Sequence, residues 1–109
     1  MLEGFPIAIA TSTESGTPNI AVAAYVKVKD NKIILTNNYM GKTIQNINQN
    51  PKISLAVWNS DWKGYQIHGT AKHYEKGEWF DFVKSMKENK NEPCKGAIVI
   101  IPESIRKIG

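Results

Sequence analysis

Apolar and polar residues alternate along much of this chain, a pattern typical of β-strands with one buried face. The segments that show it, and hence the expected strands, are Ile7–Thr13, Asn19–Val28, Lys32–Thr36, Lys52–Asn59, Tyr65–Tyr74 and Ala97–Ile101. Ser, Gly and Pro between Glu14 and Pro18 predict a turn after the first strand. The polar pair Asp30-Asn31 predicts a tight hairpin between the second and third strands.

Two further segments have helical spacing instead. In Gly41–Gln49 apolar residues recur every three or four positions, and Pro51 ends the pattern. A second helix is expected from about Gly77 to Lys87, with one apolar face formed by Trp79, Phe82, Val83 and Met86. Too few helices lie between strands for a parallel sheet. The pattern therefore predicts one mainly β domain spanning residues 1–109, an antiparallel barrel of six strands with two short helices.

The two faces of the expected strands differ in character. In Asn19–Val28 we expect one face to point to the core, formed by Ile20, Val22, Ala24, Val26 and Val28. The second face then carries Ala21, Ala23 and Tyr25, and in Lys52–Asn59 it carries Ser54, Ala56 and Trp58. A solvated exterior is normally charged. Such small residues favour a face covered by a flat ligand or a second chain; the alternative is an ordinary strand surface.

Composition and charge narrow the classes of protein. The net charge is +4, but 13 of the 14 basic residues are lysines scattered along the chain. This indicates a solvated surface or a phosphate-bearing ligand more than nucleic-acid binding, which favours clustered arginine. The apolar run Gly96–Pro102 is too short to cross a membrane, and no basic segment precedes the first apolar stretch. Cys94 is the single cysteine, so we expect no internal disulfide and a cytoplasmic protein.

The segment Leu35–Thr43 is the best candidate for ligand binding. It runs from a strand end through a flexible turn into a helix N-terminus, where unpaired amides and the helix dipole favour an anion. Lys42 and Thr43 add a positive charge and a hydroxyl, which suit a phosphate monoester. The segment is not a P-loop, because Thr36 occupies the position of the first glycine. Ordinary helix capping is the alternative interpretation.

Candidate catalytic side chains are few. His68 and His73 are five residues apart and should lie on opposite faces of one strand, so they cannot chelate one metal together. Cys94 has no neighbouring histidine, and the carboxylates near Glu78 belong to the exposed side of a helix. We therefore expect no catalytic residue and no metal site, and a cofactor would have to carry any redox chemistry.

Four segments of this chain resemble the FMN-binding split-barrel family related to pyridoxamine 5′-phosphate oxidase. They are IAIATSTESGTPNIAVAAYVKV, IILTNNYMGKTIQNINQNPKISLAV, YQIHGTAKHYE and GAIVIIPESI, and together they cover nearly the whole chain. The second is the most specific, with its strand, Lys-containing turn, short helix and Asn-Pro. The resemblance implies that the barrel is a split barrel and that two barrels pair as a homodimer with FMN in the groove between them.

The resemblance also implies a set of cofactor-binding residues: Ala21, Val22, Ala23, Leu35, Thr36, Asn37, Lys42, Thr43 and Gln66. In this arrangement Ala21–Ala23 would lie along the flavin. Leu35 and Thr36 would offer backbone groups to the ring and the ribityl chain, and Lys42 with Thr43 would hold the phosphate. Trp58 and Trp62 could cover the flavin or simply pack.

The chain departs from the vitamin B6 oxidases at the positions that matter for their substrate. Ile20 stands where those relatives often carry an arginine, and Gly64 stands where they use a glutamine; Gln66 could face the same side. The substrate-binding Trp and Arg cluster at their C-terminus is missing here. We therefore expect an FMN-dependent electron carrier or reductase with an unidentified redox partner. The alternatives are a non-catalytic flavin binder, a basic barrel that binds nucleic acid, and a haem or deazaflavin in place of FMN.

Overall fold

The computed structural model of this chain describes residues 7–23 and 25–108. Its elements in chain order are β1 (Ile7–Ser12), β2 (Pro18–Ala23), β3 (Val26–Lys29), β4 (Lys32–Asn37), α1 (Lys42–Gln49), β5 (Lys52–Trp58), β6 (Gly64–Tyr74), α2 (Glu78–Lys84), the single 3-10 turn η1 (Lys87–Asn89) and β7 (Gly96–Ile108). The mainly β class is confirmed, but the described residues form seven strands where the sequence predicts six. The expected strand Asn19–Val28 is divided into β2 and β3, and Ala24 lies outside the described residues.

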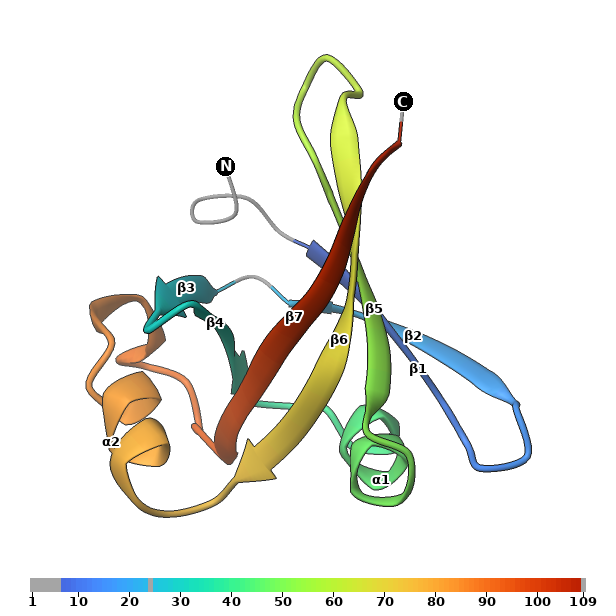
Figure 1. The fold of residues 1–109 in the computed structure, drawn as a ribbon. Coiled ribbons are helices and arrows are strands. Elements are labelled where there is room, and N and C mark those ends of the chain that lie inside the picture. Colours follow the sequence, from blue (N-terminus) through green and yellow to red (C-terminus); the bar gives the residue numbers. More distant parts are fainter. Residues whose placement is uncertain (1–6, 24, 109) are drawn as a thin grey trace.

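All seven strands belong to one sheet in the order β2-β1-β5-β6-β7-β4-β3, and every neighbouring pair is antiparallel. β2 and β3 occupy opposite edges of this sheet, yet Ala23 and Val26 are only three residues apart, which limits their Cα atoms to about 11 Å. The sheet must therefore curl until its edges approach, which gives the split barrel visible in Figure 1. The predicted Asp30-Asn31 hairpin is confirmed, with positive φ of 53° and 61° at its two turn residues.

The barrel is filled by one apolar cluster and closed at one end by α1. The buried members of the cluster include Ile7, Ile9, Leu35, Leu55, Ile67, Ile98 and Ile100, with Ile47 contributed by α1. A second cluster lies outside the barrel, where Val83 and Met86 pack on Ile34, Ala97 and Val99. α2 therefore covers the outer face of β4 and β7, while α1 lies near β1, β2 and β6 (Figure 1). No helix in residues 7–23 and 25–108 is long and apolar enough to span a membrane.

The face assignment for β2 is wrong. Ala23 is buried and Ala21 packs against the core, whereas Ile20 and Val22 are 72% and 67% exposed. The prediction assumed uninterrupted alternation as far as the next strand. Ala23 and Val26 are three residues apart and both buried, so the alternation changes phase at the break between β2 and β3.

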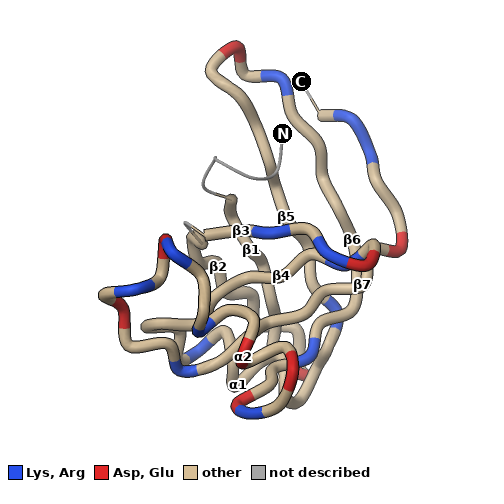
Figure 2. The backbone as a smooth tube through the Cα atoms, turned by 90° about the vertical axis from the view of Figure 1, so that its left-hand side faces the viewer, with Lys and Arg blue, Asp and Glu red and all other residues tan. Residues whose placement is uncertain are grey.

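β7 continues past Pro102, where the sequence predicts its end. Gly69 pairs with Pro102 and His68 pairs with Ser104, so Glu103 is an extra residue in β7 at this point. A proline is tolerated at such a bulge because the ladder is already interrupted there. The extension pairs with β6 as far as Gly64, and Figures 1 and 2 show it beside the β5–β6 hairpin, both projecting beyond the barrel.

Candidate functional site

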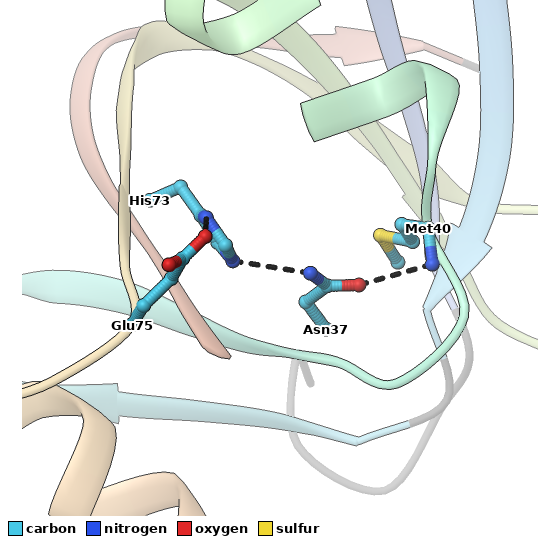
Figure 3. Close-up of polar contacts among 4 residues, drawn as sticks. All are labelled: Asn37, Met40, His73 and Glu75. Atoms are coloured by element: carbon cyan, nitrogen blue, oxygen red, sulfur yellow. Dashed lines mark hydrogen bonds and ion pairs between the residues drawn. The ribbon is translucent and has the colours of Figure 1, made fainter. Parts of the chain in front are cut away.

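The turn between β4 and α1 is held by the side chain of Asn37. The Met40 N–H donates to Asn37 Oδ1 at 3.0 Å, and Asn37 Nδ2 lies 3.0 Å from His73 Nε2 on β6 (Figure 3). Since the amide nitrogen can only donate, His73 Nε2 is the acceptor and the ring is neutral, with its proton on Nδ1. The Nδ1 atom faces Glu75 Oε1 at 3.9 Å.

Burial lowers the pKa of His73 from its ordinary value, and the exposed Glu75 carboxylate opposes this only in part. The histidine side chain is 5% exposed. A glycine at position 96 makes this packing possible, because a Cβ there would overlap His73 Nε2 and lie 2.8 Å from the Tyr74 carbonyl oxygen. The neutral ring and the Asn37 amide thus form a buried link between β6 and the turn.

A second asparagine fixes the same turn from the other side. Asn38 Nδ2 donates to Asn89 Oδ1 at 2.8 Å, and the Cys94 N–H donates to Asn38 Oδ1 at 3.1 Å. The next residue, Tyr39, is exposed, and its hydroxyl donates to the Glu92 carboxylate at 3.0 Å. That hydrogen bond raises the pKa of Tyr39. The turn is therefore tied to the loop that precedes β7.

The N-terminus of α1 follows this turn and lacks a side-chain cap. Gly41 is the N-cap residue, and the first turn of the helix contains no acidic residue. Lys42 is exposed, and no ion pair or hydrogen bond joins its ammonium to another residue of the described chain. Thr43 is 2% exposed, and its hydroxyl accepts a hydrogen bond from Asn19 Nδ2 at 3.2 Å. Open main-chain amides beside a free ammonium create a positive site that suits an anion.

A cavity of about 220 Å³ opens beside this helix start, between β2 and the end of β4. Its lining residues are Val22, Ala23, Tyr25, Thr36, Asn38, Tyr39, Met40 and Glu92. The pairing of β3 with β4 ends at Leu35, so the backbone of Thr36 lies beyond the last β3 partner. β2, the end of β4 and the start of α1 thus meet at one place.

The structure does not bring all the predicted cofactor residues together. Val22, Ala23 and Thr36 line the cavity, Ala21 lies beside them on β2, and Lys42 and Thr43 lie at the start of α1, which follows the lining residue Met40. Asn37 lies beneath the turn, where both polar atoms of its side chain are already hydrogen-bonded within the chain. Leu35 is completely buried in the barrel core and does not line the cavity.

Gln66 lies on β6, the central strand of the sheet, apart from the other candidates. Pairings place Val22, Ala8, Ala56 and Gln66 in one row across β2, β1, β5 and β6. Three strand spacings amount to about 14 Å, too far for Gln66 to reach the cavity of its own barrel. Its side chain instead accepts a hydrogen bond from Arg106 on β7.

Asn38, Tyr39 and Met40 also line the cavity; they belong to the candidate segment Leu35–Thr43 but are not among the individually predicted cofactor residues. Glu92 lines it too, and the sequence analysis does not identify it. The Tyr39–Glu92 contact joins residues 53 positions apart, so the sequence carries no local signal for it. His68 and His73 lie on opposite faces of β6 as predicted, since His68 is exposed and contacts Ser54 Oγ at 2.7 Å while His73 is buried against Asn37. No cluster of three metal-ligating side chains occurs in the part of the chain that the structure describes.

Known proteins with similar sequences show to which family this chain belongs. The family model described as pyridoxamine 5′-phosphate oxidase matches residues 2–109, so this chain belongs to that family. The uncharacterised protein MJ0282 of Methanocaldococcus jannaschii is 35% identical over 104 residues, which are 91% of this chain and 70% of that protein. The expected family and split-barrel fold are therefore confirmed.

Solved structures show the same fold. HupZ of Group A Streptococcus superposes with a TM-score of 0.86 at 26% identity, covering 95% of this chain and 85% of HupZ. An FMN-binding protein from Syntrophomonas wolfei superposes with a TM-score of 0.77, covering 94% of this chain and 76% of that protein. The identity to the latter is 20%, so this likeness shows the fold alone.

Proposed function

We propose that this chain binds FMN between two copies of the barrel and uses it for electron or hydride transfer. One observation carries the proposal: three separate segments with suitable chemistry meet at the start of α1. β2 contributes Val22 and Ala23 as a smooth apolar wall, and β4 contributes Thr36. α1 contributes its uncapped N-terminus and the unpaired Lys42 ammonium.

The donor set fits a flavin monophosphate. The phosphate would lie toward Lys42 and the first amides of α1, which attract an anion, and away from the Glu92 carboxylate, which would repel it. Thr43 would serve mainly by fixing Asn19 and the helix start, since it is almost completely buried. The isoalloxazine ring would lie against β2. Bound FMN would supply one-electron or hydride chemistry that no protein side chain provides.

A cavity of about 220 Å³ is small for a whole flavin, and ligand sites commonly span about 300–1,000 Å³. A second barrel would enlarge it. The outer face of β1, β2 and β5 carries small or apolar residues, including Ala8, Ala10, Ile20, Val22 and Ala56. Lys52 is the one charged residue of these strands, and Figure 2 shows the traces of β1 and β2 without charge.

Burying that face in a homodimer would remove the exposed Ile20 and Val22 from water. It would also bring Gln66 of a second copy toward the cavity that its own barrel cannot reach. We infer that a complete flavin site needs both copies. Oxidation of vitamin B6 is not part of the proposal, because Ile20 stands where those oxidases often carry an arginine.

Flavin titration tests the cofactor and the phosphate position. We expect FMN to bind at least about tenfold more tightly than riboflavin, and Lys42→Ala to weaken FMN about tenfold while leaving riboflavin unchanged. Lys90→Ala, which removes another exposed lysine, is the matched control. Equal affinity for FMN and riboflavin would refute the phosphate assignment. A protein that takes up haem and not FMN, recognised by its visible spectrum, would refute the cofactor.

The redox role is tested on the loaded protein. We expect reversible reduction by a chemical reductant and no turnover of pyridoxamine phosphate, because none of the described residues that line the cavity is basic and could hold the phosphate of that substrate. Rapid oxidation of reduced nicotinamide would assign a reductase within the proposed class. Saturable oxidation of pyridoxamine phosphate would overturn the proposal.

A further inference from the structure

A second and larger cavity lies along the end of β6, bordered by residues of α1 and α2. Its volume is about 510 Å³, within the usual range for ligand sites. β6 ends between α1 and α2 (Figure 1), and the cavity follows this part of the strand. It shares no lining residue with the cavity beside β2. The two cavities are therefore separate sites.

The floor of this groove is apolar and belongs to β7. Val99 pairs with Lys72 on β6 and with Ile34 on β4, so it occupies the middle of three adjacent strands. Ile101, two residues further along the same face, is 53% exposed. An exposed isoleucine beside a nearly buried valine gives a flat apolar strip that water solvates poorly.

Two lysines stand on either side of the strip. Lys72 lies on β6 and Lys32 lies on β4, and both line the groove. Because β7 separates them, their backbones are about 10 Å apart. None of the residues that line the groove is acidic. A negatively charged group between the two ammonium groups would thus meet two positive charges. The Glu103 carboxylate, which accepts from the Thr70 hydroxyl at 2.8 Å, borders the groove and is not one of its lining residues.

Aromatic rings form the remaining wall. Trp79 comes from the first turn of α2, and Tyr74 comes from the end of β6. The Lys32 ammonium lies 6.0 Å from the centre of the Trp79 ring, and the Lys72 ammonium lies 5.2 Å from that of Tyr74. These contacts hold the two charges next to the ring surfaces, where a ligand with both an aromatic ring and an anionic group would meet both kinds of partner.

We propose that this groove is a second ligand site, which binds a flat aromatic molecule carrying a carboxylate or phosphate. The ring lies on the Val99–Ile101 strip against Trp79, and the anionic group lies between Lys32 and Lys72. Nothing in this assignment depends on flavin binding, because the two cavities share no residue.

Titration of the full-length protein with naphthoate, followed by two-dimensional NMR, tests the site. The chain has three tryptophans, each with its own indole N–H signal. We expect the Trp79 signal to shift in a saturable way and the Trp58 and Trp62 signals to stay in place. Naphthyl phosphate should bind the same site, and whichever probe binds more tightly identifies the preferred anion. Neutral naphthamide should bind at least about tenfold more weakly, because it lacks the charge.

Charge-removing variants complete the test. Lys32→Gln combined with Lys72→Gln should weaken naphthoate about tenfold or more, whereas Lys87→Gln combined with Lys90→Gln, which removes the same charge elsewhere, should leave it unchanged. Equal binding of naphthoate and naphthamide would overturn the proposal. So would shifts confined to Trp58 and Trp62, or equal losses in the two double variants. The titrations are repeated with and without added FMN, so failure of flavin binding leaves this result interpretable.

Discussion

Replacing Asn37 by aspartate should reverse the pH dependence that His73 gives to the stability of this protein. Aspartate keeps the size of the side chain and the oxygen that accepts the Met40 N–H. It removes the N–H that His73 Nε2 accepts and puts a carboxylate there instead. A carboxylate at hydrogen-bond distance favours the protonated ring, so it should raise the pKa of His73, whereas burial lowers that pKa in the natural chain.

The sign follows from comparing folded and unfolded states. In the natural chain the folded pKa of His73 is below its ordinary value of 6.5, so the unfolded state takes up a proton first as the pH falls. The histidine therefore makes the free energy of unfolding decrease as the pH drops below about 6.5. With Asn37→Asp the folded pKa lies above that value. The added stability is then fully present below about 6.5 and is lost as the pH rises through the folded pKa.

The size of the effect comes from two hydrogen bonds at a buried position. Asn37 is 3% exposed, and Asn37→Ala removes both side-chain bonds, which should cost about 1–3 kcal/mol at every pH. Asn37→Asp should cost on the order of 2–3 kcal/mol near pH 8, where a buried carboxylate has only a neutral ring beside it. The cost should shrink by about 1 kcal/mol or more near pH 5.5, where the ring is charged.

Urea unfolding followed by circular dichroism, over about pH 5.5–8, measures these differences. The informative quantity is the free energy of unfolding of Asn37→Asp minus that of Asn37→Ala, because the titrating groups distant from position 37 cancel. We expect this difference to increase as the pH falls. A difference that is constant, or that decreases as the pH falls, would refute the assignment of a neutral His73 that accepts from Asn37.

Two further predictions concern the glycine behind His73 and the outer face of the sheet. Gly96→Ala should lower the free energy of unfolding by about 2–4 kcal/mol, because the added Cβ displaces His73. Gly41→Ala is the control: its Cβ meets nothing within 4 Å, so it should change the free energy of unfolding by less than about 1 kcal/mol. Similar losses for the two variants in urea unfolding would contradict the packing argument. Light scattering tests the proposed homodimer: the natural chain should be a dimer and Val22→Lys a monomer. The stability of one barrel should change by less than about 0.5 kcal/mol, because Val22 is exposed there; a persistent dimer would place the interface elsewhere.

The strand pattern predicts most of this fold because alternation is a local property of the sequence. The alternation misleads where the inward-facing positions shift by one residue and no turn residue marks the shift. Ala23 and Val26 are both buried, and no Gly or Pro marks the break between β2 and β3. The sequence therefore predicts one strand with Ile20 and Val22 inside. At Pro102 the sequence predicts that the last strand ends, whereas the strand continues, because this proline lies at a bulge within a longer strand.

The sequence predicts which segments form the candidate site but not how their side chains are arranged in space. The helix start with Lys42 and Thr43 has a local signature, and the structure confirms an eight-residue helix there. The contacts that hold this helix start have no local signature in the sequence. Asn37 contacts His73, which is 36 positions away, and Asn38 contacts Asn89, which is 51 positions away. A single sequence carries no information about such pairs. For the same reason it cannot show that Gln66 lies far from the other candidates within one barrel.

The turn before α1 is more useful as a rigid support than as a source of side-chain ligands. Asn37 and Asn38 both use the donor and the acceptor of their amides within the chain. What remains for an anion is the main-chain N–H groups of α1 and the Lys42 ammonium. Their positions are set before any ligand arrives, so binding need not order the loop, and little conformational entropy is lost. Affinity at this site should therefore depend on the buried Asn37–His73 link as much as on Lys42 itself.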